Sequence, residues 1–360
     1  MSKFKLEFTL KQHTPIIHFQ SEQSGATLRG TELKPKFDRF LKEYAFNNSE
    51  EYEKYLIKGQ EALDYKVTIH QNISKPTNID QRTSLYFGNM GDGEEKKYKL
   101  NNQKFKIEFF SYKTKLLEVI KENFEQFITM TNFGTRQSKG YGSFYIEDKE
   151  FDKNLIPYKT YSFQTRDWEK EIKLLYSFLR QGVNLPNRDG TRFYSKPAIF
   201  SYAKSKGWTW DKKAIKKEYF SNKLDEQSGD AITYQSNESY ILRDLFGLSS
   251  DQSWLSYRTT ISKENKDIER FKSPITFKVI DSFVYFWANE SYTDILDKEF
   301  EIKSNKRGNL KLKTPQKFSF DDFFEFAFNI NLFQHVESQY QNQLEYVILD
   351  RIFKDIKVKK

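Results

Sequence analysis

The order of two hydrophobic periodicities along the first 146 residues constrains the fold of this chain more than any other feature. Residues 4–10 alternate apolar and polar side chains, which is the pattern of a strand with one buried face. Apolar residues then recur every three or four positions over 33–44, as on one face of a helix. The same two patterns follow further along the chain, with strands at 63–70 and 104–110, a helix at 116–127 and a closing strand at 143–146. The predicted order is β-α-β-β-α-β.

That order is the split βαβ arrangement of ferredoxin-like domains, whose open sheet is also the scaffold of RRM domains. A chain of 360 residues is long enough for about two domains. Charged residues and Pro157 interrupt the apolar pattern between 147 and 159. After this break we predict a strand that starts at 161–163, a helix at 168–180 and paired strands at 274–287. We therefore expect an α+β protein made of two ferredoxin-like (RRM-like) domains with helical insertions. The N-terminal domain, 1–155, contains a glycine-rich loop, and the C-terminal domain, 156–360, contains a basic helical insertion.

Composition and missing motifs exclude several classes of protein. Cysteine is absent, which removes disulfides, thiolate nucleophiles and cysteine-containing metal centres. The four histidines form no HExxH motif, no ligand-spaced carboxylate cluster accompanies them, and no GxSxG motif occurs, so we expect no catalytic residues, metal or cofactor. No window approaches 18 consecutive apolar residues, and the N-terminus lacks the apolar stretch of a signal peptide. We expect a cytoplasmic protein without a membrane span.

The segment between the second predicted helix and the closing strand is rich in glycine and cations. It reads Phe-Gly-Thr-Arg-Gln-Ser-Lys-Gly-Tyr-Gly over 133–142. Glycine permits positive φ and a close approach of backbone N–H groups to an anion, while Arg136 and Lys139 supply charge that neutralises phosphate. A dinucleotide-binding fingerprint would instead follow the first strand. The loop is therefore predicted to grip a phosphodiester backbone, and a tight turn with solvated charges is the alternative.

The start of the first predicted helix is a second candidate phosphate site. Residues 25–32 have the glycine spacing of a P-loop but place Thr31 and Glu32 where Lys and Ser or Thr are needed, so nucleotide hydrolysis by that motif is excluded. A helix start with nearby cations still attracts phosphate. The cations are Arg29, Lys34, Lys36 and Arg39. The solvated face of an amphipathic helix explains the same residues.

Most of the formal net charge of +9 gathers between residues 188 and 217. This segment contains nine cations and only two carboxylates, and aromatic residues are interleaved with them. This pattern is typical of surfaces that bind single-stranded nucleic acid, although the aromatic residues fit a core equally well. We expect Arg188, Arg192 and Lys196 to contact RNA, with a solvated helix face or an acidic protein partner as alternatives.

Three of these pieces, in this order, resemble the RAMP superfamily of CRISPR-associated RNA-binding proteins. They are the strand at 4–10, the helix start Gly-x-x-Leu-Arg-Gly-Thr-Glu-Leu-Lys at 25–34, and the glycine-rich loop at 134–144. In the second half, Arg-Phe-Lys-Ser-Pro-Ile-Thr-Phe-Lys at 270–278 resembles the strand entry of two-domain subunits of type III-B (Cmr) effector complexes.

The resemblance implies ferredoxin-like domains without a catalytic centre, which bind CRISPR guide RNA or target RNA near the 3′ end of the guide. Other RAMP subunits of the effector complex are the implied protein partners. The implied RNA-facing residues are Gly134, Arg136, Lys139, Gly140, Tyr141 and Gly142, with Arg29, Lys34 and Lys36 beside them.

Two other functions stay open at this point. A metal-independent endoribonuclease of the guide-processing RAMP branch would use a general base, and His13 and His18 lie just after the first strand, where such a base could sit. In that branch, however, the glycine-rich loop lies near the C-terminus, which disfavours the enzyme. The other alternative is a basic protein scaffold that has no role with RNA.

Overall fold

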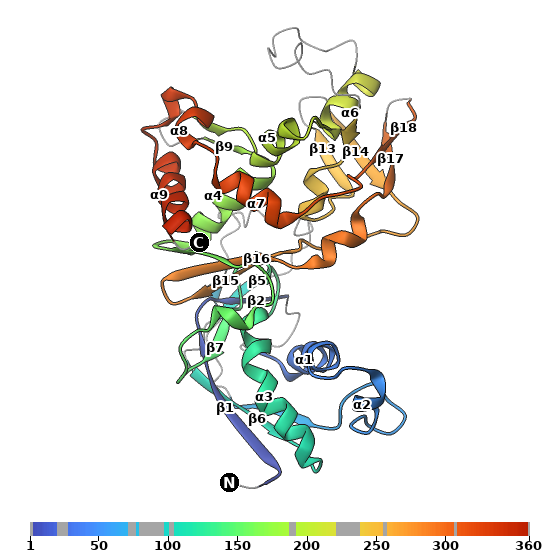
Figure 1. Cartoon of the computed structure of the whole chain (residues 1–360), viewed down its shortest axis with the longest axis vertical. Helices are drawn as coiled ribbons and strands as arrows, with labels where there is room; N and C mark the ends of the chain where they lie inside the picture. Colours follow the sequence, from blue (N-terminus) through green and yellow to red (C-terminus); the bar gives the residue numbers. More distant parts are fainter. Residues whose placement is uncertain are drawn as a thin grey trace. The chain divides into compact units, whose positions relative to one another are not determined.

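The expectation of a mixed α+β protein is confirmed by the computed structural model, in which the chain divides into two units (Figure 1). The structure describes residues 3–19, 28–70, 77–78, 97–100, 104–186, 192–220, 238–254, 258–305 and 308–358. The first unit comprises residues 1–169 and 276–287, and the second comprises 170–275 and 288–360. A hairpin from the second half of the sequence therefore belongs to the first unit.

A four-stranded antiparallel sheet organises the first unit. Its strands are β1 (Lys5–Gln12), β3 (Lys66–His70), β6 (Lys104–Phe110) and β7 (Phe144–Ile146). They lie in the order β3-β6-β1-β7. Helices α1 (Gly30–Tyr44) and α3 (Thr114–Met130) lie on one side of this sheet (Figure 1). The chain order β1-α1-β3-β6-α3-β7 confirms the order predicted from periodicity, and α2 (Ser49–Glu53) is a short addition after α1.

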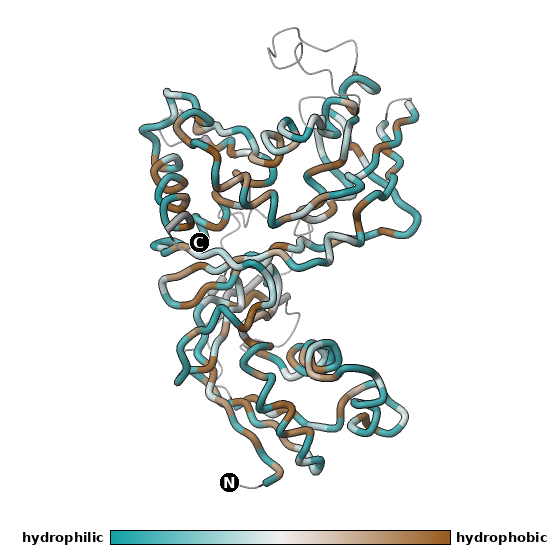
Figure 2. Tube along the Cα trace, in the orientation of Figure 1, coloured by the Kyte–Doolittle hydropathy of each residue, from teal (hydrophilic) through white to brown (hydrophobic). Residues whose placement is uncertain are grey.

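Aromatic rings fill the layer between this sheet and the two helices. The ring of Phe37 on α1 lies 4.6 Å from Phe127 and 5.5 Å from Phe124 of α3, and 5.8 Å from Phe109 of β6. All four side chains are buried. Figure 2 shows hydrophobic residues recurring along α3 between hydrophilic ones, as a helix with one buried face requires. Because this core covers one face of the sheet, alternate residues of β1, β3 and β6 point to the opposite face.

Two smaller sheets complete the first unit. In one, β2 (Ile16–Phe19) pairs with β5 (Lys97–Leu100), which also pairs with β4 (Thr77–Asn78). The other has the order β15-β16-β8 and joins β8 (Tyr161–Gln164) to a hairpin of β15 (Ile275–Ile280) and β16 (Phe283–Ala288). The hairpin confirms the paired strands predicted at 274–287.

The second unit contains a six-stranded sheet in the order β11-β12-β18-β17-β14-β13. Its strands are β11 (Thr209–Trp210), β12 (Ser239–Tyr240), β13 (Asp251–Trp254), β14 (Thr259–Glu264), β17 (Glu299–Ser304) and β18 (Leu310–Lys313). A hairpin of β9 (Val183–Pro186) and β10 (Arg192–Ser195) accompanies it. The helices are α4 (Trp168–Arg180), α5 (Ala198–Ser205), α6 (Asp211–Phe220), α7 (Phe320–Phe328), α8 (Leu332–His335) and α9 (Leu344–Val358).

The basic region before residue 220 is only partly helical, so the prediction of a helical insertion is wrong for β10 and β11. Phe193 and Ser195 of β10 are buried, whereas Arg192 and Tyr194 between them are exposed. This period of two favours a strand. It spans only four residues within a highly charged region, so the sequence pattern alone did not indicate it.

Candidate nucleic-acid interface

The glycine-rich loop between α3 and β7 lies against the start of α1. The backbone N–H of Gly134 donates to Oε1 of Glu32 at 2.7 Å. The ammonium of Lys36 donates to Oε1 of Gln137 at 2.6 Å and to the carbonyl oxygen of Asn132 at 3.2 Å. The two segments that the sequence singled out as phosphate sites are therefore in contact.

Much of the loop backbone is engaged by the connection between β1 and β2. The N–H of Thr135 donates to the carbonyl of Ile17 at 2.7 Å, and the N–H of Gly142 donates to the carbonyl of Pro15 at 2.8 Å. The hydroxyl of Thr14 donates to the carbonyl of Gly140 at 2.6 Å. The expectation that these backbone N–H groups face a phosphate is wrong for Gly134, Thr135 and Gly142, because protein oxygens accept their hydrogens.

Two of the loop glycines are required by close packing within the protein. Gly134 has a φ of +78°, and a Cβ there would lie 2.6 Å from Cγ1 of Ile16. Gly142 has a φ of +66°, and a Cβ there would lie 1.9 Å from the carbonyl oxygen of Phe133. Side chains at these positions would strain the backbone and collide with it. The two glycines thus allow the loop backbone to pack closely against Ile16 and Phe133.

Two side chains that were expected to face RNA are buried. Lys139 is 6% exposed, and its ammonium lies 5.9 Å from the centre of the Phe277 ring. Tyr141 is 2% exposed, and its ring meets the ring of Trp168 edge to face at 4.8 Å. Burial, with Glu169 nearby, raises the pKa of the Tyr141 hydroxyl. As folded, neither side chain reaches the surface.

Arg29 and Arg136 carry the unmatched charge of this region. Nε of Arg29 and both Nε and Nη1 of Arg136 are buried and have no hydrogen-bond partner within the described ranges. Burial lowers the pKa of Arg136, which also adopts a φ of +62°. Buried guanidinium nitrogens without acceptors cost free energy, and a phosphate offers paired oxygens that match them.

The start of α1 adds to this attraction for an anion. Arg29 precedes the helix and gives it no side-chain cap. The first N–H groups of an uncapped helix favour negative charge. Thr31 lies inside the first turn and does not cap the helix, because the helix already begins at Gly30.

The other predicted cations have different surroundings. The ammonium of Lys34 donates to Oδ2 of Asp38 at 2.9 Å and lies 3.9 Å from the centre of the Tyr65 ring. Arg39 is exposed on α1. Arg192 and Lys196 are exposed in the second unit, and Arg188 lies outside the described residues.

Lys278 is a buried residue that sequence reasoning missed. Its ammonium donates to the carbonyl oxygens of Ile128 at 2.7 Å and Thr131 at 2.8 Å, at the end of α3, and to that of Phe144 in β7 at 2.9 Å. A cation suits the C-terminus of a helix, although burial lowers the pKa of Lys278 well below its usual value. The only signal in the sequence is a lone lysine within the apolar strand 275–280. Lys278 joins the two elements that flank the loop.

His13 was the candidate base of the ribonuclease alternative. Its Nδ1 accepts the backbone N–H of Asp281 at 3.0 Å. Burial lowers the pKa of His13 to about 4, although Asp281 opposes this shift. The imidazole is therefore neutral near pH 7, and its Nδ1 is occupied. The side chain of His18 is not among those described.

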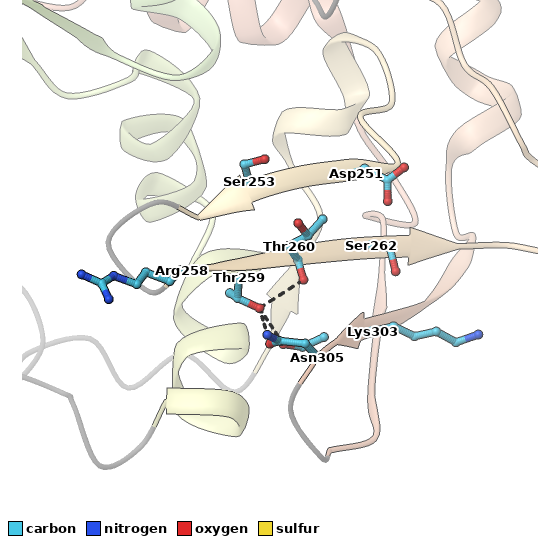
Figure 3. A pocket seen from close by; sticks show the side chains of 9 residues that line it. Asp251, Ser253, Arg258, Thr259, Thr260, Ser262, Lys303 and Asn305 are labelled. Carbon is cyan, nitrogen blue, oxygen red and sulfur yellow. Dashed lines mark hydrogen bonds between the residues drawn. The ribbon is translucent and has the colours of Figure 1, made fainter. Parts of the chain in front are cut away.

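An open polar groove of about 570 Å³ lies on the six-stranded sheet of the second unit (Figure 3). Hydroxyl groups of Ser253, Thr260 and Ser262 line it. Figure 3 shows Arg258 and Lys303 pointing away from each other toward opposite ends, and Lys303 pairs with Glu264 at 2.6 Å. Its cations do not converge, so we assign no anion site there.

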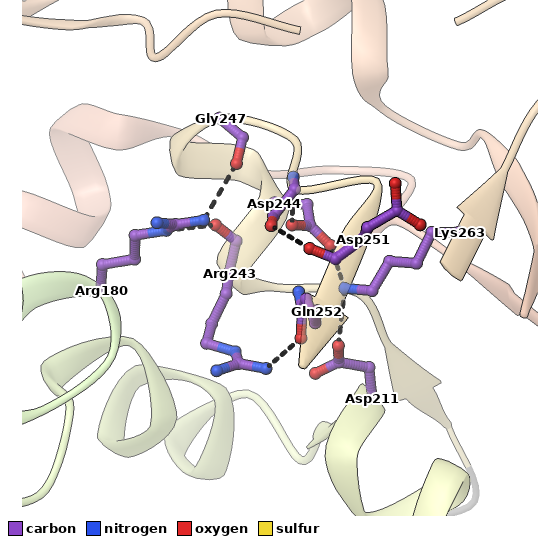
Figure 4. Close-up of polar contacts among 9 residues, drawn as sticks. Arg180, Asp211, Arg243, Asp244, Gly247, Asp251, Gln252 and Lys263 are labelled. Carbon is purple, nitrogen blue, oxygen red and sulfur yellow. Dashed lines mark hydrogen bonds and ion pairs between the residues drawn. The ribbon is translucent and has the colours of Figure 1, made fainter. Parts of the chain in front are cut away.

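A buried ion network fixes the basic helix α6 to that sheet (Figure 4). Lys263 of β14 lies 3.0 Å from Asp211, at the start of α6, and also pairs with Asp244. All three side chains are buried. Burial opposes the charge of Lys263, yet the two carboxylates raise its pKa. The three groups carry a net charge of −1, and the positive charge of Arg243 also acts on Asp211. The network anchors the start of α6, whose Lys212 and Lys217 are exposed.

Two features are absent from the described residues. No group of three or more His, Cys, Asp or Glu side chains in them is placed to hold a metal ion. None of their helices is both long and apolar enough to cross a membrane.

Comparison with known proteins identifies two family models. The Cmr1 N-terminal domain matches residues 3–183, and the Cmr1 C-terminal domain matches residues 194–358. No curated protein matches the chain.

Among solved structures, a chain of the type III-B Cmr-beta complex bound to cognate target RNA is 17% identical, with a TM-score of 0.28. That match covers 41% of this chain and 60% of the other. Cmr1 from Pyrococcus furiosus in its apo form is 15% identical over 90% of this chain and 96% of its own, with a TM-score of 0.36. A chain of Cmr-beta with target RNA, AMPPnP and ssDNA is 11% identical, with a TM-score of 0.37 and coverages of 90% and 98%. Superpositions this loose support no conclusion about the site.

Proposed function

This chain belongs to the Cmr1 family, whose two domain models together match most of its length, and on this basis we propose that it is a non-catalytic RNA-binding subunit of a type III-B CRISPR ribonucleoprotein. It contacts guide RNA, target RNA or both near the 3′ end of the guide. Its protein partners are the other RAMP subunits of the complex, and it acts in the cytoplasm.

The observation that carries the proposal is the pair of unmatched guanidinium groups where α1 meets the loop. Arg29 and Arg136 each keep buried N–H groups that no described residue accepts. The forked geometry of a guanidinium suits phosphate, and each phosphate contact adds affinity regardless of sequence. Phosphate oxygens of the RNA are the proposed partners of each of the two arginines. Arg39 adds an exposed cation on α1, whereas the ammonium of Lys36 pairs with Glu32 at 2.8 Å.

The loop from Gly134 to Gly142 forms the RNA-facing edge of the proposed site. Its buried residues support the loop and do not contact RNA. Gly140, Tyr141 and Lys139 shape the loop from within, and Arg136 makes the contact. Lys34 supports the helix beside it. Arg192 and Lys196 remain candidates for a separate contact in the second unit.

We also propose that both halves of the chain are ferredoxin-like. The strand order β3-β6-β1-β7 supports this for the first half, because it is the order of the split βαβ fold. In the second half, the chain order β8-α4-β15-β16 gives the sheet order β15-β16-β8. This repeats the order β3-β6-β1 formed by β1-α1-β3-β6. The division of the chain at 155 and 156 stays a prediction.

A non-catalytic role is supported by the state of His13. A general base needs an accessible nitrogen that can accept a proton near neutral pH, whereas the side chain of His13 is only 5% exposed and its Nδ1 is occupied. We expect no specific cleavage when the purified protein is incubated with repeat RNA and a chelator. Specific cleavage that disappears in His13→Ala would favour the endoribonuclease.

The experiment that tests the proposal measures the affinity for a labelled single-stranded RNA against salt. Arg136→Glu is expected to weaken binding about 10- to 100-fold, because a charge-assisted contact is lost and a repulsive charge replaces it. Lys121→Glu makes the same change of charge on the exposed face of α3 and serves as the matched control. Equal affinities of the two variants contradict the proposed site. An affinity that does not depend on salt favours the protein scaffold.

A further inference from the structure

The face of the four-stranded sheet opposite α1 and α3 carries an aromatic group that the proposed site does not use. In the sheet register, Phe110 of β6 stands opposite Lys5 of β1 on one side and opposite Lys66 of β3 on the other. These three residues therefore form one row across three strands. Both lysines are exposed, and Phe110 is partly exposed between them.

Tyr112 lies two residues after Phe110, just beyond the end of β6. Its side chain is 78% exposed. The Tyr112 ring lies 5.0 Å from the Phe110 ring at an angle of 79°, and 5.6 Å from the Phe4 ring at an angle of 64°. Edge-to-face contacts of this kind favour one ring orientation, while most of the ring surface stays open to solvent. A ring fixed in this way loses little freedom when a ligand stacks on it.

Cations surround the three rings. The Lys3 ammonium lies 5.0 Å from the centre of the Phe4 ring, and Lys5 pairs with the largely covered carboxylate of Glu108 at 3.0 Å. Lys66 adds a third exposed ammonium. Lysine is depleted at protein–protein interfaces, whereas rings with neighbouring cations suit unpaired nucleotides, whose bases stack and whose phosphates attract ammonium groups.

We propose that Tyr112, Phe110 and Phe4 form a stacking surface for one or two unpaired nucleotides of a single-stranded RNA. The identity of the polymer rests on the proposed function, but the residues are different from those at the start of α1 and in the loop. The bases stack on the exposed rings, and Lys3 and Lys66 contact the adjoining phosphates.

The test measures binding of a fluorescein-labelled uridine oligonucleotide to the full chain at several salt concentrations. Tyr112→Ala is expected to weaken binding about 5- to 100-fold, the range for the loss of one stacked base. Tyr112→Phe keeps the affinity within about twofold, and Tyr112→Leu behaves like Tyr112→Ala, because stacking needs an aromatic face. Since no phosphate contact is lost, the salt dependence of Tyr112→Ala stays that of the wild type. Phe333→Ala, which removes a 67% exposed ring in the second unit, is the matched control.

Each alternative outcome overturns the proposal in a recognisable way. If Tyr112→Ala binds as tightly as wild type while Arg136→Glu binds weakly, the stacking surface is wrong and the proposed function stands. If Tyr112→Leu binds like wild type, the ring contributes only apolar packing, and the stacking surface is again wrong. If the wild-type chain does not bind the oligonucleotide at low salt, both proposals fail.

Discussion

The glycine-rich loop and the open sheet face belong to the same unit and are both rich in cations and aromatic rings, yet the fold uses them in opposite ways. In the loop, Tyr141 is 2% exposed and Lys139 is 6% exposed. On the sheet face, Tyr112 is 78% exposed and Lys66 is exposed. Strand register determines which residues face outward once helices cover the other face, whereas an irregular loop has no such period. The composition of a segment therefore does not tell which of its atoms reach a ligand.

The largest effect is expected from filling the space inside the loop. Gly142→Ala places a Cβ 1.9 Å from the carbonyl oxygen of Phe133 at a positive φ, so we expect it to lower the free energy of unfolding by more than about 4 kcal/mol. Gly59→Ala is the matched control, because Gly59 also has a positive φ, of +74°, but has no atom within 4 Å of an added Cβ. It should cost about 1 kcal/mol. Equal losses in urea unfolding would mean that the loop is not packed as described.

The next largest loss of stability is expected from replacing Lys278, which joins α3 to β7. Lys278→Met removes the donor from three buried carbonyl oxygens, and we expect a loss of about 3 to 4 kcal/mol in the free energy of unfolding. Lys104→Met removes an exposed lysine of β6 and should change the free energy of unfolding by less than about 0.5 kcal/mol. A stable Lys278→Met variant would show that the ammonium is not needed to join α3 to β7.

A smaller effect is expected from titration of His13. Its pKa in the fold is about 4, below the usual 6.5, so between these values the unfolded chain binds more protons than the folded one. Stability is therefore full above pH 6.5 and falls by roughly 3 kcal/mol as the pH drops to about 4. The hydrogen bond from Lys11 and the nearby His13 lower the pKa of Asp281, which keeps that carboxylate charged through most of this range. His13→Gln cannot titrate, so the gap in stability between wild type and His13→Gln should shrink between pH 7 and pH 4. A constant gap contradicts the burial of a neutral imidazole.

The smallest change in stability is expected from replacing Tyr112, in contrast to the same replacement at Tyr141. Tyr112→Ala removes an exposed ring with two edge-to-face contacts and should change the free energy of unfolding by less than about 1 kcal/mol. Tyr141→Ala removes a buried ring and should cost about 3 kcal/mol or more. Thermal or urea unfolding of both variants checks this. If Tyr112→Ala is as unstable as Tyr141→Ala, then Tyr112 is a packing residue and the contrast between the loop and the sheet face disappears.

The positions of helices and strands could be predicted from the sequence better than the burial of individual side chains. The strand at 104–110, the helix at 168–180 and the hairpin at 274–287 follow from periodicity alone, because each has one face in a core. Contacts between distant segments leave no period. Lys278 and Glu32 serve the loop from 144 and 102 residues away from Gly134, and the local motifs that contain them do not indicate these contacts. The burial of Lys139 depends on Phe277 in the same way.

In the proposed function, the guanidinium groups at the start of α1 and in the loop bind phosphates of RNA. The most direct measurement is the slope of log K against log salt for single-stranded RNA, compared between the wild type and the double variant Arg29→Gln, Arg136→Gln. If each arginine contacts one phosphate, the slope of the double variant is smaller by about 1.4. Identical slopes in the two proteins would contradict the claim.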